Sequence, residues 1–386
     1  MFDRFSAEEM ERRRGLARTL MDEHGLDALV LFGNSGVNRH NQANVFWLTN
    51  HLDLHHCYLV LPRDSEPTLL VGLTNHVPNA REVSGIRAVE WGSYRPAEKI
   101  AERLGAARRV GLVGVNATFD MGMPYAHYLT LRDRVGEVVD VTRKFQRLRL
   151  VKSDEELEWL RRAAELSDKA MVAVAEGARP GMTEVELVAL AEHAYRSEGG
   201  MPHITFLRSM AMDDPTGCVP AQNPSHRPLE RGDVIITEFS ASYWGYSGQL
   251  HRPIFVDAEP APDWRRLFDA ALAAYEGLVE AVRTGAAVAD AIRAAAPIRD
   301  AGFTIYDDLL HGYGVDILPP LVDRARFEDS PSADGLRFER NMAVVLQPNP
   351  ITPDERMGLQ LGALTIVTDA GAESLHHVPL EPLVAA

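Results

Sequence analysis

The order of hydrophobic and polar positions predicts an N-terminal region in which helices and strands alternate. Short apolar runs occur in LDALVLFGN, HHCYLVLPR, PTLLVG and RRVGLVG, each bounded by charged or turn-forming residues. We interpret these runs, together with NVFWLTN, as strands. A helix is predicted from Ser6 to about His24, because a serine hydroxyl caps a helix start and Gly25 favours its end. Residues 1–150 are therefore expected to form an α/β domain.

Beyond about residue 150 the helical and strand-like segments are grouped instead of alternating. Ser153 opens a strong helical periodicity, and Thr183 with Glu186 forms a capping box at the start of a second helix. Strand-like runs follow in the middle of the region and again in MAVVLQPNP and LGALTIV. This grouping predicts an α+β domain over residues 151–386, with the boundary near residues 148–152.

A buried hairpin is predicted at the centre of the second domain, in RGDVIITEFSASYWGYSGQLHRPIF. Side chains of paired antiparallel strands alternate between two faces, so one face carries Glu238, Gln249 and His251. Polar groups inside such an apolar ribbon need hydrogen-bond partners or a function. We therefore expect the functional site on this face.

The amino-acid composition restricts the class of protein but does not identify a reaction. The 386 residues are 46% hydrophobic and 25% charged, as in soluble globular proteins. A net charge of −15 disfavours nucleic-acid and anionic-membrane surfaces as partners. The two cysteines, Cys57 and Cys218, provide neither a disulfide framework nor a zinc knuckle. Since no secretory signal or apolar membrane span is visible, we expect a cytoplasmic protein with a small-molecule substrate.

Several short segments together resemble one protein family. RPGMTEVEL, RPLERGD, GYSGQLHRPIF, HGYG and TDAGAESL occur in the order found in the creatinase, prolidase and aminopeptidase P family. NVFWLTN is similar to the strand before the family's YLTG-like turn, and LRLVKSDEELEWLRRAAELSDKAM is similar to its linker and first catalytic helix. The resemblance covers nearly the whole chain. It implies an α+β pita-bread catalytic domain preceded by a smaller α/β N-terminal domain, in a homodimer.

The resemblance also implies a set of metal-ligand positions. Metal-dependent members hold two divalent ions with two aspartates, one histidine and two glutamates, whose anionic oxygens offset the paired charges. The matching positions in this sequence are Glu238, Gln249, His311, Gln347 and, at or near it, Gly362. A neutral amide is a poor ligand for a hard dication. We therefore expect no metal and no other cofactor.

Creatinase itself offers a precedent, because it resembles its metallopeptidase relatives yet works without metal. Its mechanism uses a histidine as a proton shuttle and carboxylates that grip the guanidinium group. In this sequence Ala221 or Gln222 stands at the position of that histidine, and the carboxylate positions fall at His251 and Gln347. The resemblance therefore implies a metal-free pocket without implying creatine as the substrate.

Three side chains are candidates for proton transfer: Glu238, His311 and His251. A buried carboxyl group has a raised pKa, and an imidazole shuttles protons near neutral pH. The alternative for Glu238 is a structural partner of one of the histidines. The alternative for His311 is a core histidine bonded to a carbonyl group.

Other polar and aromatic side chains are candidates for substrate binding. Gln249 and Gln347 either orient the substrate or are uncharged replacements for lost metal ligands. Arg252 either binds substrate or braces the hairpin, and Tyr246 either lines the pocket or packs in the core. His203 is expected to face the cleft. Two further candidates, His55 and His56, lie in the N-terminal domain. The alternative is that they are exposed histidines of a loop without a role in binding.

These observations lead us to expect a metal-independent small-molecule hydrolase, or lyase, of creatinase type. It is expected to cleave a C–N bond in a compact polar substrate that carries a carboxylate. One alternative is an Xaa-Pro-type metallopeptidase whose ligands lie elsewhere in the sequence. The other is a non-catalytic binding protein on a pita-bread scaffold.

Overall fold

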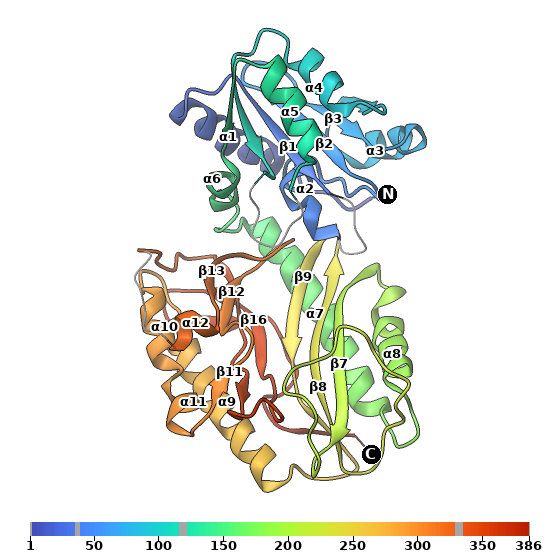
Figure 1. Cartoon of the computed structure of the whole chain (residues 1–386), viewed down its shortest axis with the longest axis vertical. Coiled ribbons are helices and arrows are strands. Elements are labelled where there is room, and N and C mark those ends of the chain that lie inside the picture. The colour runs from blue at the N-terminus through green and yellow to red at the C-terminus, as the bar shows by residue number, and fades with distance from the viewer. Residues whose placement is uncertain (1, 35–38, 116–121, 329–334, 386) are drawn as a thin grey trace. The chain divides into compact units, whose positions relative to one another are not determined.

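The computed structural model describes residues 2–34, 39–115, 122–328 and 335–385. The chain divides into two compact units, residues 1–149 and residues 150–386 (Figure 1). Among the described residues, no helix is both long enough and apolar enough to cross a membrane.

The N-terminal unit is built on a mixed six-stranded sheet with the order β4-β3-β2-β1-β5-β6. The strands are β1 (Ala28–Gly33), β2 (Cys57–Pro62), β3 (Thr68–Val71), β4 (Ala88–Trp91), β5 (Arg109–Val113) and β6 (Glu137–Asp140). The helices are α1 (Ala7–Glu23), η1 (Arg39–Gln42), α2 (Ala43–Thr49), η2 (Thr74–His76), α3 (Val77–Val83), α4 (Pro96–Leu104), α5 (Tyr125–Arg134) and α6 (Thr142–Arg147). Two apolar clusters cover the two faces of the sheet, one with α1, α2, α3 and α6 and the other with α4 and α5. This unit is therefore a three-layer α/β structure, as predicted.

One predicted strand of this unit is a helix. NVFWLTN forms most of α2, and every residue of that helix is buried. Asn50 ends it in the left-handed conformation with φ 60°, and its N–H donates to the Phe46 carbonyl oxygen. The strand prediction was wrong because a short, wholly apolar run has the same hydrophobic pattern in a buried strand and in a buried helix.

The C-terminal unit contains a ten-stranded sheet with helices packed against each half (Figure 1). Its order is β13-β12-β14-β16-β9-β8-β10-β18, with β7 paired to β8 and β17 paired to β16. The strands are β7 (Gly200–Ala211), β8 (Asp233–Tyr243), β9 (Tyr246–His251), β10 (Ile254–Val256), β12 (Leu310–Gly312), β13 (Leu318–Val322), β14 (Ala343–Leu346), β16 (Gly362–Val367), β17 (Ala372–Ser374) and β18 (Leu383–Ala385), besides the small pair β11 (Thr304–Ile305) and β15 (Pro350–Ile351). The helices are α7 (Asp154–Gly177), α8 (Glu184–Arg196), α9 (Pro262–Ala281), α10 (Val288–Ala294), α11 (Ala296–Asp300) and α12 (Arg324–Glu328).

The predicted helix starts of this unit are present. The Ser153 hydroxyl accepts from the backbone N–H of Glu156, whose carboxylate accepts from the Ser153 N–H. Thr183 and Glu186 make the same reciprocal pair at the start of α8. Each capping box satisfies two N–H groups that a helix start otherwise leaves unpaired.

The hairpin formed by β8 and β9 has the register that gives the sheet a polar face. Its tight turn has Trp244 at φ 45° and Gly245 at φ 86°, two positive values that match the twist of paired strands. Ser240 pairs with Gln249. Alternation therefore places Glu238 on the same face as Gln249, while the opposite face packs on α7.

Close packing against α7 holds β9 in position. A Cβ atom at Gly248 would lie 2.4 Å from the backbone nitrogen of Ala164 in α7. The next residue of the strand is Gln249, so this contact also sets the depth of the polar face.

Gly248→Ala is expected to destabilise the C-terminal unit by about 1–3 kcal/mol, because the added methyl group overpacks the contact with the α7 backbone. Gly314→Ala is a matched control, since a Cβ atom there would meet Lys152 Cε at an ordinary 3.5 Å. Urea unfolding of both variants measures the difference. Equal stabilities would contradict the packing described here.

Candidate active site

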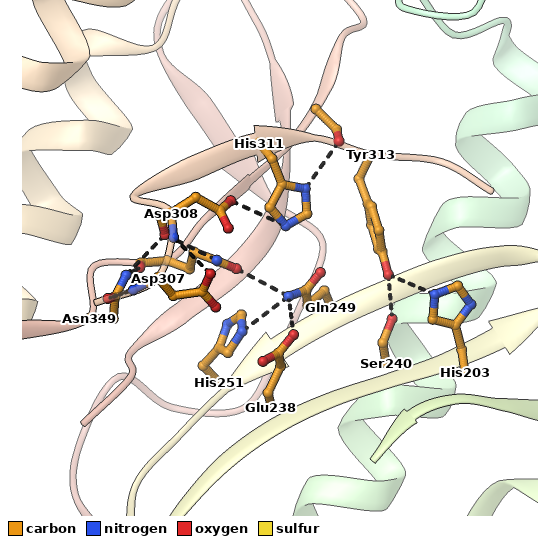
Figure 2. A network of polar contacts seen from close by, with 12 residues as sticks. His203, Glu238, Ser240, Gln249, His251, Asp307, Asp308, His311, Tyr313 and Asn349 are labelled. Carbon is orange, nitrogen blue, oxygen red and sulfur yellow. Dashed lines mark hydrogen bonds and ion pairs between the residues drawn. The ribbon is translucent and has the colours of Figure 1, made fainter. Parts of the chain in front are cut away.

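Polar side chains on four strands, or directly after them, lie on one face of the C-terminal sheet. The strands β12, β14, β16, β9 and β8 are hydrogen-bonded in this order, so residues far apart in the sequence come together. Figure 2 shows the side chains that meet there. Those predicted from the sequence and labelled there are Glu238 from β8, Gln249 and His251 from β9, and His311 from β12. Gln347, also predicted, follows β14 directly and lies beside Gln249.

The side-chain amide of Gln249 lies at the centre of this group. Its Nε2 is 3.0 Å from Glu238 Oε1 and 3.1 Å from Gln347 Oε1, and it donates to both. It also lies 3.2 Å from His251 Nε2. A single amide nitrogen therefore connects a carboxylate, a second amide and an imidazole.

Sequence reasoning missed two members of the site, Asp307 and Asp308. They lie between β11 and β12, and Asn349 holds their segment: its Oδ1 accepts from the Asp307 N–H and its Nδ2 donates to the Asp308 carbonyl oxygen. Gln347 Nε2 donates to the same carbonyl oxygen at 3.1 Å. The available signal was the pair of consecutive acids shortly before His311 in the sequence.

We call Glu238, Asp307 and Asp308 the acidic cluster. Each of the three remains partly accessible, whereas Gln249 and Gln347 are buried beside them. The residues of the acidic cluster are therefore the more accessible part of this polar face, and we call the two buried amides its floor.

His311 is oriented toward the acidic cluster. Its Nδ1 lies 3.1 Å from the Gly312 carbonyl oxygen, which makes Nδ1 the protonated nitrogen. Its Nε2 then carries the lone pair and lies 3.9 Å from Asp308 Oδ2. The basic nitrogen of the imidazole thus faces the carboxyl groups.

Burial shifts the pKa of every titratable group in the site toward the neutral form. It raises the pKa of Glu238 well above its usual range, and the charges of Asp307 and Asp308 raise it further. Burial and the Asp308 charge raise the pKa of Asp307 to about 7, and burial also raises the pKa of Asp308. Burial lowers the pKa of both His251 and His311. Burial therefore favours the neutral form of each of these carboxyl and imidazole groups.

His203 lies on the same polar face but belongs to a neighbouring network. Its Nδ1 is 2.8 Å from Ser247 Oγ and its Nε2 is 3.2 Å from the Tyr313 hydroxyl, which in turn lies 3.1 Å from Ser240 Oγ. The Tyr313 ring packs against the His311 ring with centroids 5.1 Å apart. His203 therefore supports one wall of the site through Tyr313 (Figure 2).

Two of the predicted substrate-binding residues do not face the acidic cluster. The Tyr246 hydroxyl donates to Glu156 Oε1 at 2.6 Å, on the α7 side of the sheet. The Arg252 guanidinium, 1% exposed, donates to four backbone carbonyl oxygens, including those of Gly362 and Val378. Both side chains brace the sheet from its other face, because they alternate with Gln249 and His251 along the chain.

His55 and His56 belong to a histidine-rich surface of the N-terminal unit. The His55 ring stacks on His76, whose Nδ1 is 2.6 Å from the buried Asp53 carboxylate. The His56 ring packs against His127. Aromatic contacts and one buried carboxylate thus hold these imidazoles together.

Comparison with known proteins gives the family. The model of metallopeptidase family M24 matches residues 158–369, and the creatinase/prolidase N-terminal domain matches residues 13–151. The chain belongs to the M24 metallopeptidase family. Its C-terminal unit thus has the pita-bread fold of the family, and the chain is related to Xaa-Pro peptidases, which hydrolyse C–N bonds.

Individual relatives of the family match over the full length. The probable dipeptidase PepE of Mycobacterium bovis is 27% identical over 395 residues, covering 99% of this chain and 98% of its own. The Xaa-Pro dipeptidase of Pyrococcus furiosus is 24% identical, covering 92% of this chain and 94% of its own. The crystal structure of dipeptidase PepE from Mycobacterium ulcerans superposes with a TM-score of 0.79 at 25% identity and covers both chains completely.

These findings correct the functional prediction. A metal-independent hydrolase or lyase of creatinase type was expected, but the family is one of metallopeptidases and its matching members are named dipeptidase and Xaa-Pro dipeptidase. The prediction was wrong because it gave the missing metal ligands more weight than the similarity of the whole chain to metallopeptidases.

The donor set of this chain nevertheless differs from the five-ligand set of the family. Gln249 and Gln347 supply amides, and the Gln249 nitrogen points its N–H groups at Glu238. At Gly362 a Cβ atom would lie 2.3 Å from the Leu346 carbonyl oxygen and 3.0 Å from His251 Nδ1, so no side chain fits there. Among the described residues, no three His, Cys, Asp or Glu side chains are arranged to hold a metal ion. The residues present do not fit a dinuclear centre of the family type.

Asp307→Asn is expected to stabilise the protein at pH 8 but not at pH 4. Folding favours the protonated Asp307, so this contribution to stability is complete below the ordinary pKa of 3.8 and is lost as the pH rises through about 7. At about 1.4 kcal/mol for each pKa unit, the gain at pH 8 is at most about 4 kcal/mol.

Urea unfolding at both pH values measures this difference. Asp300→Asn, at the exposed end of α11, is the control and should show no such dependence on pH. A variant at position 307 that is less stable than the parent at pH 8 would refute the raised pKa.

Proposed function

We propose that this chain is a peptidase that hydrolyses the peptide bond of a dipeptide, of the Xaa-Pro type. The observation that supports the proposal is the convergence of the acidic cluster and His311 on one face of the pita-bread sheet, in a chain that matches dipeptidases from end to end. A partly accessible set of carboxyl groups over a polar floor suits a short zwitterionic substrate.

Glu238 is the proton-transfer group at the reacting bond. Hydrolysis adds water to the carbonyl carbon, breaks the C–N bond and transfers the water proton to the leaving nitrogen. A carboxyl group with a raised pKa is a stronger base when ionised and keeps the accepted proton long enough to deliver it. Glu238 therefore accepts the proton from water and donates it to the amine.

His311 and the two aspartates complete the proton path. Asp308 Oδ2 lies 3.9 Å from His311 Nε2, an ion-pair distance that a small shift or a water molecule would convert to a hydrogen-bonded contact, and the Asp308 backbone N–H donates to Asp307 Oδ1 at 2.8 Å. A proton can thus be held on either the imidazole or a carboxyl group. This arrangement keeps Glu238 available while the amine leaves.

Gln249, Gln347 and His251 position the reacting groups. Because Gln249 Nε2 donates to Glu238, it orients the carboxylate and limits its rotation. Gln347 is tied to the Asp308 backbone and so couples the aspartate segment to the floor. His251 supports the Gln249 amide at 3.2 Å from the buried side.

Glu238→Gln is expected to lower the rate of Xaa-Pro dipeptide cleavage by at least about 100-fold, the usual effect of removing a positioned acid or base. The assay measures release of proline from Ala-Pro, with and without added Mn²⁺, so that a requirement for a cation does not hide activity. Glu176→Gln, on the exposed side of α7, should cleave at the parent rate. An inactive parent enzyme, or full activity in Glu238→Gln, would refute the proposal.

We also propose that the chain forms a homodimer. The support is the family resemblance, in which the N-terminal domain of one subunit reaches the partner's active site. His55 and His56 would then bind the carboxylate of a dipeptide from the partner side.

Light scattering is expected to give twice the chain mass of 42.7 kDa. Changing both His55 and His56 to alanine should raise KM for Ala-Pro without changing that mass. A monomer with full dipeptidase activity would contradict the proposed arrangement.

A further inference from the structure

A cavity in the N-terminal unit has no part in the proposed peptidase reaction. It has a volume of about 430 Å³ and lies among the start of α1, the end of α2 and the turn before β4. This volume lies in the range of small-molecule sites. The lining residues are Arg4, Phe5, Ala7, Met10, Arg14, Asn50, Glu66, Gly85 and Arg87.

The cavity gathers positive charge in a strongly acidic protein. Three arginines line it, Arg4, Arg14 and Arg87, against one acidic residue, Glu66. The whole chain carries a net charge of −15. Arginine forks match the oxygens of carboxylates and phosphates, so the local excess of guanidinium groups selects an oxyanion.

These guanidinium groups are incompletely paired within the described part of the chain. Arg14 Nε is buried without a hydrogen-bond partner, although Arg14 Nη1 lies 3.3 Å from Glu11. Arg87 makes no hydrogen bond or ion pair there, and Arg4 donates to the Glu82 carbonyl oxygen at 3.4 Å. Arg4 and Arg87 are exposed, so the cost of a buried unpaired donor falls on Arg14 Nε, and a bound acceptor recovers it.

Asn50 adds an acceptor of a different kind. Its side chain is 1% exposed, and its Nδ2 donates to the Asp3 carbonyl oxygen at 3.2 Å, which sets the orientation of the amide. Its Oδ1 is buried without a partner. This oxygen calls for a hydrogen-bond donor on the ligand, such as a hydroxyl or amino group.

Apolar side chains complete the lining. Phe5 and Met10 are both 5% exposed and provide a surface for a short carbon chain. The Phe5 ring also lies under Arg13, whose guanidinium carbon is 3.9 Å from the ring centroid, so the aromatic wall is held in place.

We propose that this cavity binds a small organic oxyanion, either a carboxylate or a phosphate monoester, whose carbon chain carries a hydroxyl or amino group. The oxyanion lies between Arg14 and Arg87, and the hydroxyl or amino group donates to Asn50 Oδ1. The site is separate from the acidic cluster and does not depend on the proposed peptidase activity.

Isothermal titration calorimetry of the full chain with L-malate and with glycerol 3-phosphate tests the proposal. At least one of them is expected to bind saturably, and the tighter one identifies the preferred oxyanion. Arg87→Ala should weaken this binding by about tenfold or more, because a charge-assisted hydrogen bond is lost. Arg143→Ala is the matched control: this arginine of α6 is exposed, does not line the cavity and should leave binding unchanged.

A second comparison tests the role of Asn50. Where malate binds, succinate should bind more weakly, because it lacks the hydroxyl group; for glycerol 3-phosphate the same comparison uses inorganic phosphate. The absence of saturable binding by both probes, or equal affinities in the parent and Arg87→Ala, would overturn the proposal. Equal binding of the ligands with and without the carbon-borne hydroxyl would overturn the assignment of Asn50.

Discussion

The hydrogen bonds of one amide, that of Gln249, connect the polar side chains on one face of the C-terminal sheet. Burying carboxyl groups in an apolar sheet is costly unless their oxygens are paired. Gln249 Nε2 meets this requirement by donating to Glu238 and Gln347 while it lies against His251. The remaining cost appears as raised carboxyl pKa values and a neutral pair of imidazoles. The groups whose pKa values are shifted by burial are the same groups that we assign to catalysis.

The chain combines the fold of the M24 family with a set of donor side chains that differs from the family's set. The sheet register brings residues from β8, β9, β12, β14 and β16 to one place, whichever side chains the positions carry. Here the positions carry amides and a glycine, and two aspartates before β12 add carboxyl groups of their own. The scaffold therefore determines where chemistry occurs, and the local side chains determine its electrostatics.

Local patterns in the sequence predicted much of this arrangement. The alternation within residues 231–255 placed Glu238, Gln249 and His251 on one face, and the Ser153 and Thr183 capping boxes marked two helix starts. Asp307 and Asp308 were missed because their position depends on Asn349, a contact between distant strands that no local pattern reveals. The helical conformation of α2 was not predicted because all of its residues are buried, so the sequence lacks the alternation of apolar and polar positions that marks a helix. Tyr246 and Arg252 were placed near the substrate by proximity in sequence, although alternation directs them to the other face.

The most direct test of the central claim is a crystal structure of Glu238→Gln soaked with Ala-Pro. We predict that the scissile carbonyl and the leaving nitrogen both lie within reach of the side chain at position 238, with His311 and the two aspartates beside them. A dipeptide bound away from these residues, or a site that excludes the dipeptide while the protein remains folded, would contradict the account.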